Sequence, residues 1–184
     1  MAADEVRGIL RAYKQVMEAS WPNLHPGMSV RAPRWIHASE DELRKELDDY
    51  LAEASQPNTR VRIFWKTGPA LQFGGCNRPF AHDAGFAEPR DLIGLDDFDE
   101  RLPWTRQASK YREDDEQVFY SAIPKLDIVE RQGQSDGTTL WVRAGKTPIL
   151  AAGGEVLGIL GMYEILDADV GRKLFAERLT GTKP

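Results

Sequence analysis

Three strand-like segments follow one another near the C-terminal end of the chain, and they constrain the fold more than any other feature. Each is rich in β-branched and apolar residues, and they span residues 125–134, 138–150 and 155–166. The turn-forming pairs Asp136-Gly137 and Gly153-Gly154 separate them. Such pairs favour tight connections between antiparallel strands. The sequence therefore predicts a three-stranded antiparallel meander.

Two further strand-like segments lie upstream, at residues 60–66 and 70–76, and a Gly-Pro turn joins them as a plausible hairpin. Between this hairpin and the meander, the pattern predicts a brief helix over 77–85, a turn over 88–94 and a longer helix over 103–122. The order of two strands, helices and three antiparallel strands indicates an α+β fold.

Helices are predicted on both sides of this region. Apolar residues recur at helical spacing over 4–19, and a proline-rich loop follows. A second helix over 40–54 begins with a capping box formed by Ser39 and Glu42. A domain boundary is expected near residue 56, where the pattern changes to strands. The tail over 167–179 returns to helical spacing.

Composition limits the partners and the location. The 184 residues carry a formal net charge of −5 with a pI near 5.3, and no basic stripe is visible, so we expect no nucleic-acid partner. The most apolar late stretch, 155–166, is too short to span a bilayer, so no membrane insertion is expected. A single cysteine, Cys76, and a start without a leader pattern predict a cytoplasmic protein.

The segment "FGGCNRPFAHDAGF" at 73–86 joins a strand to a helix and invites a search for chemistry. Asn77 has the position of an N-cap, and Gly85 that of a glycine just past the helix end. No phosphate-binding glycine motif is present. Cys76 and His82 could form a nucleophile and base, but a small strand residue and a surface histidine explain them more simply. We therefore predict a structural corner and no catalytic residue.

Metal sites have no sequence signature either. His25, His37 and His82 show no paired spacing, so no metal is expected. The acidic run at 96–100 does not place glycine and glutamate where a calcium loop needs them. Its aspartates are expected to cap turns.

Asp115 interrupts the apolar stripe of the predicted 103–122 helix. A buried carboxylate requires hydrogen-bond partners. We expect a backbone amide as its partner, with contact to a ligand as the alternative.

Five segments together resemble PAS sensor domains, particularly those found upstream of bacterial diguanylate cyclases and histidine kinases. They are "GCNRPFAHDAGF", "DLIGLDDFDERLPW", "YREDDEQVFYSAIP", "DGTTLWVRAGKTPIL" and "GEVLGILGMYEILD". The resemblance implies a PAS fold, a five-stranded antiparallel sheet with short helices on one face. It divides the chain into an N-terminal helical extension (1–56), a PAS sensor domain (57–167) and a C-terminal linker helix (168–184). Ala122 departs from the family, which commonly has glycine there.

The resemblance also bears on cofactors. Flavin-binding LOV members carry a reactive cysteine after the helix-starting asparagine, whereas Arg78 follows Asn77 here. Haem-binding members have a histidine on the long helix, and 104–121 contains none. Covalent flavin and haem are therefore disfavoured. An unliganded interaction domain and a pocket for a small organic ligand both remain open; the pocket would be lined by Phe80, Phe86, Leu92, Phe98, Trp104, Tyr111, Asp115 and Phe119.

The expected function is a non-catalytic bacterial sensory module that signals to a downstream cyclase or kinase. The alternative is a small cone-shaped α+β enzyme or ligand-binding protein with Asp115 as a buried carboxylate, and strand order separates the two folds. The apolar stripes of the flanking helices require burial. A homodimer with paired N-terminal helices is favoured over packing of these helices on their own domain.

Overall fold

The computed structural model describes residues 2–20, 38–133 and 136–180. The proline-rich loop, His25 and His37 lie outside these residues. The helices and strands occur in this order: α1 (Ala3–Ser20), α2 (Glu40–Glu53), β1 (Val61–Thr67), β2 (Gln72–Cys76), α3 (Arg78–Asp83), the 3₁₀ turns η2 (Pro89–Leu92) and η3 (Thr105–Gln107), α4 (Ala108–Ser121), β3 (Lys125–Gly133), β4 (Thr139–Leu150), β5 (Val156–Leu166) and α5 (Ala168–Thr180).

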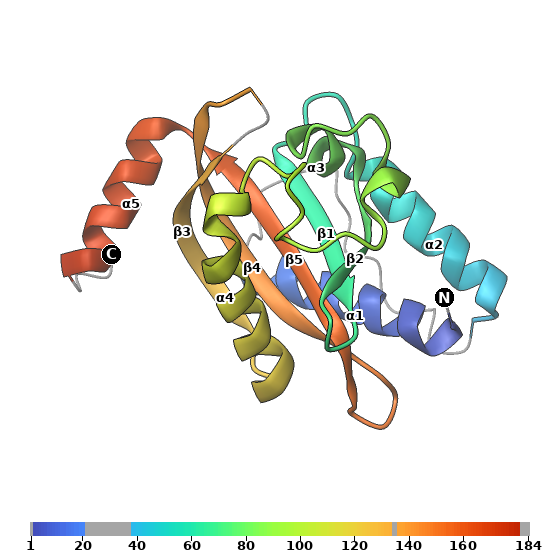
Figure 1. Ribbon diagram of the computed structural model, residues 1–184. Helices are drawn as coiled ribbons and strands as arrows, with labels where there is room; N and C mark the ends of the chain where they lie inside the picture. Colours follow the sequence, from blue (N-terminus) through green and yellow to red (C-terminus); the bar gives the residue numbers. More distant parts are fainter. Residues whose placement is uncertain (1, 21–37, 134–135, 181–184) are drawn as a thin grey trace.

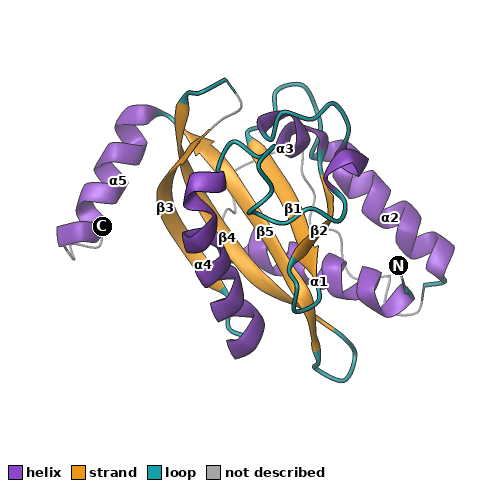
Figure 2. Cartoon of the chain, viewed as in Figure 1, coloured by secondary structure: helices purple, strands orange, loops and turns teal. Residues whose placement is uncertain are grey.

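One five-stranded sheet organises the molecule, with the strand order β2-β1-β5-β4-β3 (Figures 1 and 2). Every neighbouring pair is antiparallel. The C-terminal meander supplies three adjacent strands, and β1 pairs with β5, the last of them. The predicted five-stranded antiparallel sheet and α+β class are confirmed.

The face of the sheet turned toward the viewer in Figure 1 carries α3 and α4. On β1, Phe64 and Lys66 point to this face, whereas Ile63 and Trp65 belong to the core on the opposite face. Both sets are buried. Since strand side chains alternate between faces, β1 must be covered on both sides.

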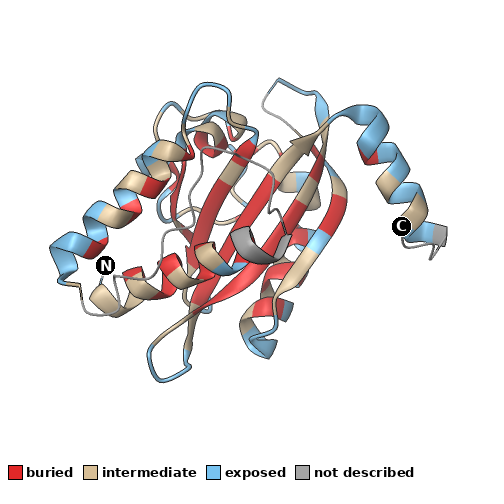
Figure 3. Cartoon of the chain, turned by 180° about the vertical axis from the view of Figure 1, so that it is seen from behind, coloured by how far each residue is buried: buried red, intermediate tan, exposed pale blue. Residues whose placement is uncertain are grey.

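The opposite face is covered by α1 and α2. Figure 3, which views the molecule from the side opposite to Figure 1, shows α1 crossing over the central strands. Its apolar stripe packs with Trp65 and Ile149 from the sheet, and Tyr13 of α1 lies 4.9 Å from Tyr50 of α2 between ring centroids. The stripe consists of Val6, Ile9, Leu10, Tyr13 and Val16. The N-terminal segment is therefore a structural layer of the sheet.

This packing corrects the favoured account of the N-terminal helices. The homodimer was inferred from apolar stripes that needed a cover. Val6 and Val16 are fully buried within the single chain, and Leu43 of α2 is as well. These helices pack on their own domain, so their stripes give no support to a dimer. The predicted boundary near 56 falls between α2 and β1, and the three-part division of the chain stays a prediction.

Local signals at helix ends are confirmed. Ser39 and Glu42 form the capping box of α2. Asn77 caps α3 by accepting a hydrogen bond from the Phe80 amide, and Gly85 follows with a positive φ of 86°. The helix predicted over 103–122 is shorter, since a 3₁₀ turn precedes α4. It ends at Ala122, whose φ of 56° is left-handed, the conformation in which glycine is favoured.

The C-terminal helix α5 lies beside β3 and β4. Gly171 packs against Trp141, where a Cβ atom would come within 2.4 Å of the side chain. Phe175 stacks edge-on against the same indole with ring centroids 5.5 Å apart. Val170 and Leu179 are exposed. Among the described residues, no helix is long and apolar enough to cross a membrane.

The role of α1 as a layer of the core gives a direct prediction. Leu10→Ala should lower the free energy of unfolding by about 2–5 kcal/mol, because Leu10 is buried in the core between α1 and the sheet. Leu179→Ala is the matched control on another helix and should change it by less than about 0.5 kcal/mol, because its side chain is exposed. Denaturant unfolding measures both. Equal effects would show that α1 does not pack on the sheet.

Candidate functional site

A small cavity lies between α4 and the front face of the sheet. The centres of water-sized molecules have about 40 Å³ of space in it. One water needs ~10–15 Å³, so the cavity has room for about two or three waters. Its wall contains Phe64, Lys66, Phe73, Phe80, Asp97, Trp104, Tyr111, Glu130, Gln132, Ala144, Gly145, Lys146, Met162 and Tyr163.

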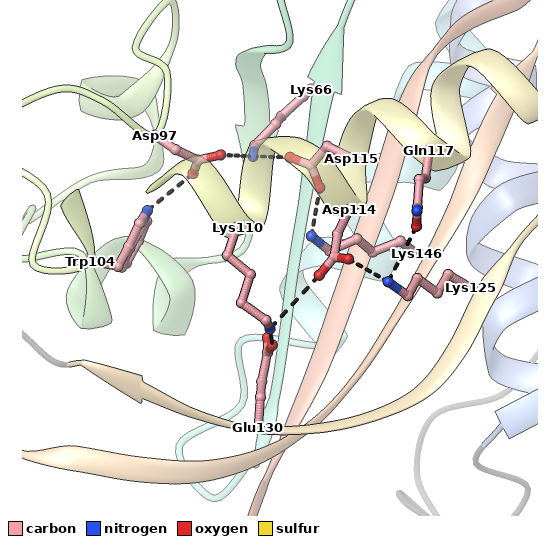
Figure 4. Close-up of polar contacts among 10 residues, drawn as sticks. All are labelled: Lys66, Asp97, Trp104, Lys110, Asp114, Asp115, Gln117, Lys125, Glu130 and Lys146. Carbon is pink, nitrogen blue, oxygen red and sulfur yellow. Dashed lines mark hydrogen bonds and ion pairs between the residues drawn. The ribbon is translucent and has the colours of Figure 1, made fainter. Parts of the chain in front are cut away.

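A cluster of buried charges forms one part of this site (Figure 4). Lys66 of β1 donates to Asp97 and, at 2.5 Å, to Asp115 of α4. Lys146 of β4 donates to the other Asp115 oxygen at 2.6 Å. Trp104 donates its indole N–H to Asp97 at 3.1 Å. Two strands, a helix and a loop therefore meet at one set of ion pairs.

The charges in this cluster support one another. Burial alone would raise the pKa of Asp115, but the ammonium groups of Lys146 and Lys66 outweigh burial and hold that pKa below its ordinary value. Burial likewise acts to lower the pKa of Lys146, yet Asp115 raises it above its ordinary value. Asp115 is therefore a carboxylate and Lys146 an ammonium group at neutral pH.

More ion pairs surround the cluster toward the surface. Lys125 pairs with Asp114, and Lys110 pairs with Glu130, whose side chain lines the cavity. Figure 4 shows these residues beside Asp115 and Lys146. The charges at the outer edge are thus also paired.

A second polar group lies elsewhere on the wall. Gln132 donates its side-chain amide to the Tyr163 hydroxyl at 3.1 Å, and that hydroxyl donates to Asp83 at 2.9 Å. Arg62 pairs with the same carboxylate at 2.8 Å. Burial and the neighbouring Asp83 raise the pKa of Tyr163, so its hydroxyl stays protonated. This series of hydrogen bonds and the ion pair with Arg62 links the cavity to β1 and α3.

Gly161 lies between two residues of the cavity wall. On β5 it pairs with Phe64 on one side and Lys146 on the other. A Cβ atom at this position would lie 2.1 Å from the Phe64 ring. The missing side chain lets the ring lie over the strand, where it stacks on Phe80 with centroids 4.8 Å apart.

The predicted pocket residues divide between the cavity wall and other positions. Phe80, Trp104 and Tyr111 line the cavity, and Asp115 binds two lysines that line it. Four others do not form its wall. Leu92 is buried in the surrounding core, Phe86 and Phe119 pack partly buried at its edge, and Phe98 is 49% exposed. Ligand binding by any of the eight stays a prediction.

Three charged residues of the site were missed by sequence reasoning. The expected backbone partner of Asp115 is in fact two lysine side chains, Lys66 and Lys146. Asp97 was assigned to turn capping, yet it is 4% exposed and paired with Lys66. Its neighbours Asp96 and Asp99 do accept turn amides as predicted. For the two lysines the available signal was a charged residue at an inward position of a predicted strand, whereas Asp97 lies in a loop and has no such signal.

The other candidates for chemistry have ordinary surroundings. Burial raises the pKa of the Cys76 thiol to about 12, so the thiol is protonated and a poor nucleophile at neutral pH. His82 is exposed and lies 3.2 Å from the Ala87 carbonyl oxygen. Within the described residues, no three metal-ligating side chains converge.

Comparisons with known proteins identify the fold. No protein-family model matches the chain, and no curated protein is similar to it in sequence. Solved structures do match. A PAS domain from Colwellia psychrerythraea aligns with a TM-score of 0.50 and 15% identity over 65% of this chain and 97% of that one. The chain has the PAS fold.

Receptor proteins with this fold also match. VqmA bound to DPO aligns with a TM-score of 0.56 and 19% identity over 64% of this chain and 57% of VqmA. An RNA-binding light-oxygen-voltage receptor aligns with a TM-score of 0.54 and 18% identity over 74% of this chain and 38% of the receptor. The chain thus spans a little over half of VqmA.

The VqmA and RNA-binding receptor structures correct the expectation of no nucleic-acid partner. VqmA from Vibrio cholerae has also been solved as a ligand–DNA complex, and the light-oxygen-voltage receptor binds RNA. Proteins that contain this fold therefore include nucleic-acid-binding receptors. The absence of a basic stripe here was not a sound reason to exclude such a partner.

The ion cluster predicts a large and pH-dependent effect of one substitution. Asp115→Ala should lower the free energy of unfolding at pH 7 by about 3–5 kcal/mol, because two buried ammonium groups lose a shared partner. Glu113→Ala, at an exposed site on the same helix, should change it by less than about 0.5 kcal/mol. Denaturant unfolding of both variants tests this.

The pH dependence fixes the mechanism of that effect. The folded-state pKa of Asp115 is lowered, so its stabilisation is complete above the unfolded pKa of about 3.9 and is lost as pH falls through the folded pKa. The difference between wild type and Asp115→Ala should therefore narrow below about pH 4. A difference that stays constant from pH 7 to pH 2.5 would contradict the ion-pair account.

Proposed function

We propose that this chain is a PAS sensory module that binds a small organic ligand in the cavity beneath α4. Ligand occupancy changes the packing of α4 and the sheet, and α5 carries that change to an output segment. The protein is non-catalytic in this proposal, and its localisation is cytoplasmic.

The observation that carries the proposal is the combination of an aromatic cavity with an incompletely used ammonium group. An ammonium has three N–H donors. Lys146 is 5% exposed and lines the cavity, and Asp115 is its hydrogen-bond acceptor among the described residues. Buried polar groups normally use their hydrogen-bonding capacity. A bound molecule would supply the additional acceptor.

Fold neighbours support a ligand of modest size. VqmA has been solved bound to DPO. The space here is about 40 Å³, below the roughly 150 Å³ of a cavity that binds benzene, so the proposal requires the cavity wall to open around an organic ligand. The proposal leaves haem and covalently bound flavin outside the ligand class. Arg78 follows Asn77 where a flavin-reactive cysteine would be, and 104–121 has no histidine.

Transmission is proposed to run along β5. Tyr163 of this strand lines the cavity, and Leu166, three residues later, pairs with Trp141. Trp141 in turn contacts Gly171 and Phe175 of α5. A shift of β5 therefore reaches the helix through directly packed groups. The output segment has two candidates. The resemblance to PAS sensor domains predicts a cyclase or histidine kinase, whereas VqmA has been solved bound to DNA.

The rival enzymatic reading has weaker support. A general base needs a carboxylate that is free to accept a proton near neutral pH. Both oxygens of Asp115 are bound by lysine ammonium groups, which hold its pKa low. The strand order is that expected for the sensor fold. These observations favour binding over proton transfer.

A cavity-filling substitution tests the proposal. Ala144→Leu places a larger side chain in the cavity wall, whereas Ala168→Leu adds the same atoms at an exposed site on α5. DPO and a panel of single-ring aromatic compounds are titrated by ligand-observed NMR. At least one compound should bind wild type and Ala168→Leu, and lose at least tenfold in affinity for Ala144→Leu.

The stability of the variants serves as a control, because overpacking a full core costs about 1–3 kcal/mol and a cavity absorbs much of that cost. Ala144→Leu should therefore retain a cooperative thermal transition close to that of wild type. If no compound binds in an Ala144-sensitive manner, the cavity is not a ligand site and the proposed function is wrong.

A further inference from the structure

The outer edge of strand β3 forms the floor of an open groove. β3 is the last strand in the sheet order, so no other strand of the described residues pairs with its outer side. Figure 1 shows β3 at the edge of the sheet, between α5 and α4. Side chains of both helices and of the strand line a space of about 530 Å³, which we call the β3 groove.

The two edge strands of the sheet differ in how they are covered. At β2, the backbone N–H and C=O of Phe73 bond to the loop at 94–95 at 2.8 and 2.9 Å, so a loop continues the hydrogen bonding. Within the described residues, no backbone segment does the same for 127–131 of β3. A bare strand edge is a template for pairing with another chain, and proteins normally cover or blunt it.

Two side-chain contacts show which backbone groups face the groove. Arg178 donates to the Asp127 carbonyl at 3.3 Å, and Gln107 donates to the Arg131 carbonyl at 3.4 Å, both from outside the sheet. Backbone groups of successive residues in an antiparallel strand point alternately toward and away from the neighbouring strand. Val129, midway between the two carbonyls, therefore presents its N–H and C=O to the groove. Both contacts exceed the usual limit of ~3.2 Å, so an incoming backbone can replace them.

The β3 groove is positively charged, although the whole chain has a formal net charge of −5. Four basic and two acidic side chains line it. Each acidic side chain is paired with a lysine of the same groove. The guanidinium groups of Arg131 and Arg178 are left without a carboxylate partner among the described residues. An acidic occupant would complement them.

Apolar surface accompanies these guanidinium groups. Phe175 and Leu179 line the groove from α5 and are 37% and 74% exposed. Arg131 lies 5.9 Å from the Trp141 ring, which Phe175 contacts from the other helix face. The side of the groove next to α5 thus combines positive charge with apolar contact area.

We infer that the edge of β3 binds an extended, acidic segment of a partner protein as an added strand. The backbone of the segment pairs with Val129 and Arg131. On the side next to α5, its acidic side chains meet Arg131 and Arg178, and an apolar side chain between them meets Phe175. The inference goes beyond the proposed function and does not depend on a ligand in the cavity beneath α4.

Two other occupants fit the groove less well. A second copy of this chain would bring two positively charged grooves together, and like charges facing each other are unfavourable. A nucleic acid would match the positive charge, but it would make no use of the strand edge, and its phosphates would meet the two carboxylates on the wall.

Two blocked heptapeptides test the inference on the whole ¹⁵N-labelled protein. In the first, threonine alternates with glutamate, valine and glutamate; in the second, lysine replaces both glutamates. The acidic peptide should bind with a Kd below about 1 mM, at least about tenfold more tightly than the basic one. At saturation it should slow hydrogen exchange of the Val129 and Arg131 amides, because these amides gain backbone partners.

Arg178→Glu assigns the binding to the β3 groove. It reverses one of the two unpaired charges at an exposed position of α5 and should weaken binding of the acidic peptide at least about tenfold. Arg172→Glu, also exposed on α5 but outside the groove, is the matched control and should change the affinity by less than about threefold.

Several results would overturn the inference. They are absence of binding by the acidic peptide, equal binding of the basic peptide, and unprotected Val129 and Arg131 amides at saturation. Self-association that protects the same amides without peptide would instead assign the edge to a second copy. Tighter binding of a single-stranded oligothymidylate, lost in Arg178→Glu, would assign the groove to nucleic acid. Each of these outcomes leaves the cavity proposal in place, because Ala144→Leu tests that proposal separately.

Discussion

The ion cluster of Lys66, Asp115 and Lys146 is the interaction on which the organisation of the front face depends. Its members come from β1, α4 and β4, and Asp115 is completely buried between the two ammonium groups. Charges in such a place are stable only while each keeps its partner. The cluster therefore fixes the position of α4 over the sheet. It also sets the polarity of the cavity that the helix covers.

The two faces of the sheet have different roles. The back face is closed by α1 and α2 around an apolar core that includes Trp65, whose indole lies over Gly75. The front face contains the aromatic cavity and the charges. β5 contributes to both cores and is followed directly by α5, and the proposed transmission rests on this arrangement. In that proposal, the back layer supports the sheet while β5 shifts.

Local features of this fold were predictable from sequence, and long-range partners were not. The hairpin turns, the Ser39 capping box and the Asn77 cap depend on residues a few positions apart, and all are confirmed. The partners of Asp115 lie 49 and 31 positions away on separate strands, so no local pattern identifies them. Burial of Asp115 could be inferred from its stripe, but the identity of its partner required the sheet register.

The error about the N-terminal helices has a similar origin. An apolar stripe shows that a helix is covered and does not show by what. One signal was available: "RIFWK" places large side chains on both faces of β1, which indicates a sheet covered on both sides. Phe98 shows the opposite error. It was predicted to line the pocket, but it lies in an acidic loop and is exposed.

Side-chain NMR of ¹⁵N-lysine-labelled protein tests the central claim most directly, because buried ammonium groups bound to carboxylates exchange their protons slowly with water. The account predicts that, at neutral pH, Lys66 and Lys146 give ammonium signals whose exchange is much slower than that of the exposed Lys45 and Lys173. Asp115→Ala should abolish both signals or strongly accelerate the exchange of these ammonium protons with water. Exchange of Lys66 and Lys146 as fast as that of Lys173 in the wild-type protein would show that the buried cluster does not exist in solution.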